Sequence, residues 1–258
     1  MNDRIQNAFK NGKAFIGFLT GGDPSIEKSE EFILEMVRAG ADLIEIGIPF
    51  SDPIAEGPVI QKADIRALND GATVDKIFAS AARIRQKADV PLVFLTYLNP
   101  VFRCGYGNFF RRCAEAGVDG VIIPDLPFEE QGEARAAGAK TGVDLISLVA
   151  PTSAERIRAI AKAAKGFVYV VSSMGVTGVR SRFETDVAAL VRAVKAETSV
   201  PAAVGFGVSA PDQAAALAVH ADGVIVGSAI VRLVEQYGAN AGPYIYDYVK
   251  KMKQALRR

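Results

Sequence analysis

The stretch IEIGIPFSDPIAEGP, residues 44–58, combines the pattern of a buried strand with acidic side chains that such a strand normally excludes. The run 42–48 is rich in isoleucine and is followed by proline, as expected for a strand covered on both faces. Glu45 interrupts this run, and Glu56 follows in the loop after it. A carboxylate inside a buried strand loses its hydration and needs a physical reason to be there. The stretch therefore predicts a buried strand whose carboxyl end and following loop carry polar chemistry.

The same alternation of a short apolar run and a longer helix-like segment recurs along the whole sequence. The expected strands are residues 14–20, 42–48, 92–97, 120–124, 143–149, 167–172, 202–205 and 223–227. Eight such units in 258 residues predict an α/β fold, a (β/α)₈ TIM barrel formed by one domain over residues 1–258. An open doubly wound sheet is the alternative, but it usually has fewer strands, and TGGDPS (20–25) lacks the glycine pattern of a dinucleotide-binding loop.

Capping residues predict where several helices begin and end. Asp23, which precedes a proline, and Thr152, which begins the capping-box segment TSAE (152–155), are the expected caps of two helices. Gly40, Gly71 and Gly117 lie where helices should stop, because glycine readily adopts the left-handed conformation that ends a helix.

Composition excludes several classes of partner. The protein has 30 Lys and Arg against 29 Asp and Glu, so it lacks the positive charge of a nucleic-acid-binding or membrane-anchoring protein. The apolar run 14–19 is too short for a signal peptide, and no run reaches the roughly 20 residues of a membrane span. We expect a cytoplasmic protein with no nucleic-acid or membrane partner.

The residue inventory also narrows the chemistry. One histidine, His220, and two cysteines, Cys104 and Cys113, form no metal-binding pattern, so we expect no metal site and apolar packing for the cysteines. No lysine lies within an expected strand, and Lys140 and Lys165 precede strands at the end opposite a barrel's active site. The sequence thus lacks the residues that Schiff-base, metal or nicotinamide chemistry would need at the expected site, and proton transfer by carboxylates remains.

Glu45 is the leading candidate for that proton transfer. Its apolar neighbours Ile44 and Ile46 should remove water and raise its pKa above the usual value of about 4.3, so that it can donate and accept a proton near neutral pH. The alternative is a buried glutamate whose hydrogen bonds are satisfied by a polar neighbour. For Glu56 the alternative is an ordinary solvated loop carboxylate.

Glycine-rich turns near the end of the sequence predict a phosphate site. The segments GFGVSAPD (205–212) and GSAIV (227–231) follow the last two expected strands and lead into helices, so backbone N–H groups can face an anion. The segment SMGVTGVRS (173–181) could form a third side of the same site. Ordinary turns are the alternative.

Large apolar residues near the carboxyl ends of the strands could hold a flat aromatic group, or could simply be barrel core: Phe18, Leu95, Tyr97, Ile122, Leu148 and Tyr169.

Seven motifs occur together in one order: FLTGGDPS, IEIGIPFSDPIAEGP, TYLNPVFRCG, GVDGVIIPDLPFEE, SSMGVTGV, GFGVSAPD and GSAIV. In sequence and separation they resemble the alpha subunit of tryptophan synthase over essentially the whole length. The resemblance implies a lyase that splits indole-3-glycerol phosphate into indole and glyceraldehyde 3-phosphate by a reverse aldol reaction in tryptophan biosynthesis. It also implies no cofactor in this polypeptide and an α₂β₂ assembly with a pyridoxal-phosphate-containing beta subunit, which receives the indole.

The resemblance further implies roles for single residues. Glu45 matches the family's catalytic proton donor, and Glu56 occupies the position of a catalytic aspartate, which keeps the charge but lengthens the side chain. The implied indole-binding residues are Phe18, Leu95, Tyr97, Tyr169 and Thr177. The implied phosphate-binding residues are Gly178, Gly207, Gly227 and Ser228, and the implied contacts with the beta subunit are Pro49, Asp52 and Asn99.

Two other functions remain open at this point. One is a stand-alone indole-3-glycerol phosphate lyase that is fully active without a partner. The other is a weakly active protein whose main role is to activate the beta subunit.

Overall fold

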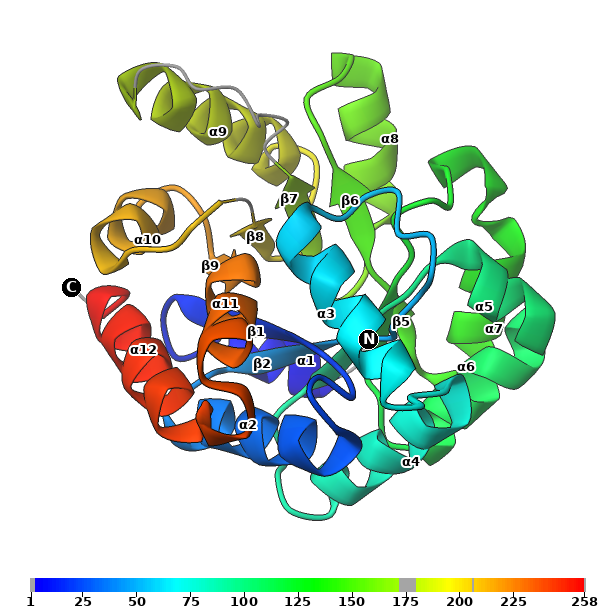
Figure 1. The fold of residues 1–258 in the computed structure, drawn as a ribbon. Helices are drawn as coiled ribbons and strands as arrows, with labels where there is room; N and C mark the ends of the chain where they lie inside the picture. Colours follow the sequence, from blue (N-terminus) through cyan, green and yellow to red (C-terminus); the bar gives the residue numbers. More distant parts are fainter. Residues whose placement is uncertain (1–2, 172–179, 206, 258) are drawn as a thin grey trace.

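The computed structural model describes residues 3–171, 180–205 and 207–257. In these residues, strand segments form one parallel sheet at the centre of the molecule, and helices surround it (Figure 1). The strands are β1 (Ala14–Thr20), β2 (Leu43–Gly47), β3 (Leu92–Leu95), β4 (Gly120–Ile122), β5 (Asp144–Leu145), β6 (Ser147–Val149), β7 (Val168–Val171), β8 (Ala202–Gly205) and β9 (Gly223–Val226). Their order in the sheet is β5-β4-β3-β2-β1-β9-β8-β7-β6.

The two ends of this sheet belong to one stretch of sequence. Only Ile146 separates β5 from β6, and these two segments together occupy the predicted strand 143–149. β5 pairs with β4, whereas β6 pairs with β7. The interrupted strand therefore joins both ends of the sheet, and the predicted (β/α)₈ barrel is confirmed over the open-sheet alternative.

The helices are α1 (Asp3–Ala8), α2 (Ile26–Arg38), α3 (Pro58–Asn69), α4 (Val74–Arg85), α5 (Leu98–Cys104), α6 (Tyr106–Glu115), α7 (Gly132–Thr141), α8 (Ala154–Ala163), α9 (Arg180–Lys195), α10 (Pro211–Ala218), α11 (Ser228–Tyr237) and α12 (Gly242–Ala255), with short 3₁₀ turns η1 (Phe128–Glu130) and η2 (Gly238–Asn240). The long helices turn an apolar face to the strands, as α2 does with Phe32, Ile33 and Met36. No helix in the described residues is both long and apolar enough to cross a membrane.

The predicted helix starts were each wrong by one or two residues. Ser25, not Asp23, caps α2, because the Asp23 carboxylate is engaged by the Arg66 guanidinium at 2.8 Å for both oxygens. Ser153 rather than Thr152 caps α8. The predicted helix ends are confirmed, because three glycines in the left-handed region follow α2, α3 and α6: Gly40 (φ +102), Gly71 (φ +80) and Gly117 (φ +75).

Two apolar cores lie on either side of the strands. The outer core fills the space between strands and helices. The inner core fills the lower part of the barrel with residues of the strands and their flanks, and Ile5 of α1 joins it from below: Ile16, Leu43, Val93, Ile122, Ile146, Phe167, Ala203 and Ile225. Ile5 is fully buried, so α1 closes the amino-terminal end of the barrel.

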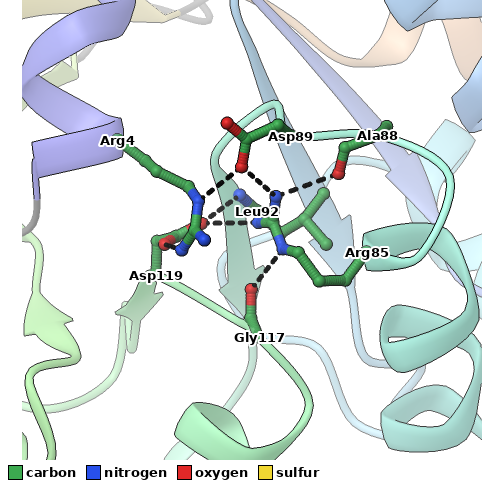
Figure 2. A network of polar contacts seen from close by, with 7 residues as sticks. All are labelled: Arg4, Arg85, Ala88, Asp89, Leu92, Gly117 and Asp119. Carbon is green, nitrogen blue, oxygen red and sulfur yellow. Dashed lines mark hydrogen bonds and ion pairs between the residues drawn. The ribbon is translucent and has the colours of Figure 1, made fainter.

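A polar network holds α1 in this position (Figure 2). Asp119, next to the start of β4, accepts hydrogen bonds from Arg4 Nη1 at 3.2 Å, Arg85 Nη2 at 2.7 Å and the Leu92 backbone N–H at 2.9 Å. Arg4 also donates to the exposed Asp89 at 2.7 Å. One buried carboxylate thus links α1, α4 and the beginnings of β3 and β4.

This network generates a prediction for stability. The Asp119→Ala variant should lose about 3 kcal/mol in free energy of unfolding, because the largely buried Arg85 guanidinium is left without its carboxylate. Urea unfolding followed by circular dichroism measures the change. The control Asp89→Ala removes a carboxylate whose side chain is 87% exposed and should cost under about 1 kcal/mol. Equal losses in the two variants would contradict the role given to Asp119.

Candidate active site

Glu45 projects into the barrel directly above the inner core. It pairs in register with Phe18 of β1 and Val93 of β3. Leu43, two residues earlier on β2, belongs to the inner core, and successive strand residues alternate between faces, so Glu45 lies on the same inward face. Its side chain is fully buried, and neither carboxyl oxygen has a hydrogen-bond partner among the described residues.

This environment changes the acidity of Glu45. Burial is the main cause that raises its pKa to about 8, and the charge of Glu56 adds to the shift. The group is therefore mostly protonated near neutral pH, yet close enough to its pKa to give up and regain a proton. The described residues do not supply the polar neighbour that the alternative interpretation of a satisfied buried glutamate requires.

The loop after β2 brings Glu56 to the same end of the barrel. The Tyr97 hydroxyl accepts a hydrogen bond from the Ala55 backbone N–H at 3.0 Å, and Gln61 donates to the Glu56 carbonyl oxygen at 2.9 Å. Glu56 itself is partly buried, and burial raises its pKa to about 7. The loop is therefore pinned at both sides of Glu56.

The charge of Glu56 acts on several groups of this cluster. Its charge raises the pKa values of Glu45, Tyr97 and Tyr169, with burial the larger cause in each case. The structure thus brings Glu45, Glu56 and the predicted tyrosines into one cluster.

Strand glycines make room for the aromatic side chains of this cluster, a feature that the sequence interpretation did not use. A Cβ atom at Gly47 would lie 2.8 Å from the Phe18 ring, and one at Gly205 would lie 2.5 Å from the Tyr169 hydroxyl. A Cβ atom at Gly227 would also approach Phe18, at 3.2 Å. Glycine near the carboxyl end of a strand, opposite an aromatic residue of the neighbouring strand, was the available signal.

The residues predicted either to hold an aromatic group or to form barrel core lie at different depths. Leu95, Leu148 and Tyr169 are partly buried and pack on the upper side of the inner core, where they can line a pocket. Ile122 is fully buried within the inner core itself, so it is floor rather than wall. Tyr97 is almost fully buried and stacks on Phe50 at 5.4 Å between ring centres, where it supports the loop that carries Glu56.

The predicted phosphate-binding turns differ in how free their N–H groups are. The helix α11 begins at Ser228 after Gly227 without a side-chain cap, so its positive end faces the barrel mouth. At the start of α10, Gln213 accepts hydrogen bonds from the Ser209 and Ala210 N–H groups, at 3.0 and 3.2 Å. Gly207, just before α10, is exposed. Thr177 and Gly178 lie outside the described residues.

The residues implied for partner contact do not all face outward. Asp52 and Asn99 are exposed, but Pro49 is buried. Two exposed apolar side chains lie near them in the sequence, Ile54 at 82% and Phe102 at 70% exposure, and the sequence interpretation did not single them out. Large apolar residues in the segments after the second and third strands were the available signal.

The opposite end of the barrel has a separate cavity of about 690 Å³, formed by the segment before β1, the segment before β8 and the end of α12. Several basic side chains line it, among them Lys13, Lys195 and Lys253, which are held by Ala221, Asp222 and Asp42 respectively. It lies at the floor of the barrel, away from Glu45. Among the described residues, no group of three or more His, Cys, Asp and Glu could hold a metal ion.

Comparison with known proteins agrees with this geometry. A model of the tryptophan synthase alpha chain family matches residues 5–257. The protein belongs to this family. It is therefore a lyase that cleaves indole-3-glycerol phosphate to indole and glyceraldehyde 3-phosphate in tryptophan biosynthesis, and members of the tryptophan synthase alpha family need no cofactor, since pyridoxal phosphate resides in the beta subunit.

Individual relatives are similar over nearly their full length. The tryptophan synthase alpha chain of Lactiplantibacillus plantarum is 49% identical over 253 residues, which cover 98% of this protein and 96% of the relative. The crystal structure of the alpha subunit from Legionella pneumophila superposes with a TM-score of 0.91 at 36% identity, covering 100% of this protein and 99% of that one. A subunit of the α₂β₂ complex of Pyrococcus furiosus superposes with a TM-score of 0.85 at 34% identity, covering 94% and 99%.

The unpartnered Glu45 generates a prediction for the pH dependence of stability. Its pKa in the fold, about 8, lies above the ordinary 4.5, so its contribution to stability is complete below about pH 4.5 and is lost as pH rises through about 8. Glutamine cannot ionise. The Tm of Glu45→Gln should therefore exceed that of the wild type by roughly 4 °C or more at pH 9, and the gap should shrink at pH 5.

Differential scanning calorimetry at both pH values measures this gap. The matched control is Glu155→Gln, which changes an exposed glutamate and should give the same small difference at pH 5 and pH 9. A gap for Glu45→Gln that is independent of pH would show that Glu45 is not desolvated in solution.

Proposed function

We propose that Glu45 and Glu56 divide the work of indole-3-glycerol phosphate cleavage, with Glu45 as the acid and base and Glu56 as the fixed anion. The observation that carries the proposal is a fully buried carboxyl group without a hydrogen-bond partner among the described residues, beside a second carboxylate at the carboxyl ends of the strands. In a barrel of this kind, that end is where active sites form.

The reaction balances with Glu45 alone as the proton carrier. Glu45 donates its proton to the indole ring carbon that bears the glycerol group, and a ring π pair forms the new C–H bond. The ring nitrogen then carries positive charge. The Glu45 carboxylate takes the proton of the adjacent glycerol hydroxyl, and the O–H pair becomes the carbonyl π bond. The bond between the ring carbon and the glycerol carbon breaks, its electron pair returns to the ring, and indole and glyceraldehyde 3-phosphate result.

Glu56 supports this sequence of steps by its charge. Its pKa of about 7 lies below that of Glu45, so Glu56 ionises first while Glu45 keeps its proton. A fixed anion opposite the ring N–H stabilises the positive charge that grows there, and it does so more strongly where water is excluded. The extra methylene relative to aspartate lets the carboxylate reach across from a loop that is pinned on both sides.

The remaining contacts follow from the same placement. In this proposal Phe18, Leu95 and Tyr169 flank the indole ring, and Tyr97 fixes the Glu56 loop. The phosphate group binds at the uncapped start of α11, with Gly227 and Ser228, and at Gly207. Thr177 and Gly178, which lie outside the described residues, are proposed from the family resemblance to contact the indole and the phosphate respectively.

Substitution of the two carboxylates tests the proposal. Glu45→Gln should lower the rate of indole release by more than about 10²-fold, the scale for loss of a general acid–base. Glu56→Gln should be severely impaired, whereas Glu56→Asp should stay active, because the negative charge matters more than the reach of the side chain. Steady-state kinetics with indole-3-glycerol phosphate give these rates. Wild-type turnover by a folded Glu45→Gln variant would rule out this mechanism.

We further propose that this protein acts as a single domain in the cytoplasm, bound to a beta subunit in an α₂β₂ assembly. The related structure from Pyrococcus furiosus is such an α₂β₂ complex, with mutual activation. In the present protein, the exposed Asp52, Ile54, Asn99 and Phe102 lie in segments that follow β2 and β3, at the mouth of the barrel. Exposed apolar side chains in segments that also carry exposed polar residues suit a protein partner, and indole released at this mouth would enter the partner directly.

A charge placed in this surface tests the assembly. Phe102→Asp should reduce the stimulation of indole release by a beta subunit at least 10-fold and leave the basal rate nearly unchanged, because it buries a charge in an apolar contact. The control Val219→Asp alters another exposed apolar residue, at the end of α10, and should keep full stimulation.

The wild type itself tests the two alternative functions. Full activity of the wild type alone, without stimulation by a beta subunit, would favour the stand-alone lyase. Weak basal cleavage and strong activation of the beta subunit would favour the activating partner.

A further inference from the structure

A third buried carboxylate, Asp64 on α3, lies beside the pair that the proposed mechanism uses. Its residue is 5% exposed, and Thr20, at the end of β1, is fully buried next to it. The Thr20 hydroxyl donates to Asp64 Oδ1 at 3.4 Å, and the Phe50 backbone N–H interacts favourably with the ionised form of the same carboxyl group, which lowers its pKa. Asp64 therefore connects α3 to the end of β1 and to the loop after β2.

Two further contacts connect Phe50 to the part of the loop that carries Glu56. Phe50 stacks on Tyr97, and the Tyr97 hydroxyl accepts the Ala55 N–H, one residue before Glu56. Asp64 thus supports the first part of the loop, while Tyr97 supports the part that carries the catalytic carboxylate. Loss of the Asp64 anchor would free the loop at Phe50 and loosen the position of Glu56.

The charges around Asp64 are nearly all negative. The carboxylates of Glu56 and Asp23 both raise its pKa, and burial, the largest cause, brings it to about 7. Arg66 is two residues away on α3, but its guanidinium is committed to both oxygens of Asp23. No salt bridge reaches Asp64 within the described part of the molecule. Asp64 and Glu56 therefore repel each other when both are ionised.

We propose that Asp64 is a positioning residue for the cleavage reaction, which anchors the Glu56 loop through Phe50 and acts on Glu56 by its charge across the buried space between them. The proposal rests on the role given to Glu56 above. Two like charges that interact in a buried site lose their protons as a pair, in two overlapping steps. While Asp64 is protonated it carries no charge, and Glu56 can lose its proton. Once Asp64 is ionised, its negative charge raises the pKa of Glu56.

Two variants separate the anchor from the charge. Asp64→Asn keeps an oxygen acceptor for the Phe50 N–H and removes the charge, so Glu56 should ionise more easily. The acid limb of the kcat/KM profile should shift to lower pH by about 0.5 unit or more, while the alkaline limb, set by Glu45, should stay in place. Asp64→Ala also removes the anchor and should lower kcat/KM at least 10-fold at every pH.

The outcomes distinguish this proposal from the one on which it rests. The control Asp247→Asn changes an exposed aspartate of α12 and should leave the profile unchanged. If Glu56→Gln is inactive while Asp64→Asn leaves the acid limb in place, the positioning role of Asp64 is wrong and the mechanism survives. If Glu56→Gln keeps wild-type turnover, the role of Glu56 fails, and the proposal for Asp64 fails with it.

A measurement on the unmodified protein covers the case in which the variants do not fold. Carboxyl-carbon NMR of the labelled wild type follows Glu56 and Asp64 through a pH titration. The proposal requires that both signals titrate in two steps, each responding to the other group. Two independent single-step curves would overturn it.

Discussion

The desolvation of Glu45 is the constraint on which the rest of the structure depends. This carboxyl group, which has no hydrogen-bond partner among the described residues, keeps its raised pKa only while water stays out of the barrel. The inner core below it is apolar and includes the fully buried Ile5 of α1, and Asp119 holds α1 in place through Arg4. The packing of the barrel interior beneath Glu45 is therefore part of what keeps this carboxyl group buried.

The two ends of the barrel use buried charge in opposite ways. At the floor, Asp119 is surrounded by guanidinium groups and a backbone donor, so its charge is compensated and the contacts contribute to stability. At the mouth, within the described residues, Glu45, Glu56 and Asp64 lack such cations, and each has a raised pKa. Uncompensated carboxylates cost stability, particularly at high pH, and they provide the proton donors and fixed anions that a cleavage reaction needs.

The barrel and both central carboxylates could be predicted from the sequence because each leaves a local signal. Repeated apolar runs indicate strands, and Glu45 stands out because it interrupts one of them. The depth of a residue within the barrel leaves no such signal, because alternation indicates the face of a strand and not the layer. The sequence therefore left open whether Ile122 lines a pocket or belongs to the core, and the structure places it in the inner core. Helix starts at Asp23 and Thr152 were misplaced because a distant partner, Arg66, or an adjacent serine decides which residue caps. Asp64 was missed because an acidic residue on a helix is usually exposed, whereas here α3 packs against β1 and buries it beside Thr20.

The replacement of aspartate by glutamate at position 56 is best understood together with Asp64. A longer side chain reaches further but has more conformers. Fixing its extra rotatable bond when the substrate binds costs at most about 1 kcal/mol of conformational entropy. Fixed neighbours reduce that cost, because the loop is held at Ala55 and Gln61. Burial and the charge of Glu56 raise the pKa of Asp64, so Asp64 on the α3 side keeps its proton when Glu56 ionises. The longer side chain of Glu56 can then carry its charge without a second anion behind it, and Glu45 and Tyr169 respond to that charge. A buried acid that stays protonated can in this way leave the negative charge on the residue that the reaction uses.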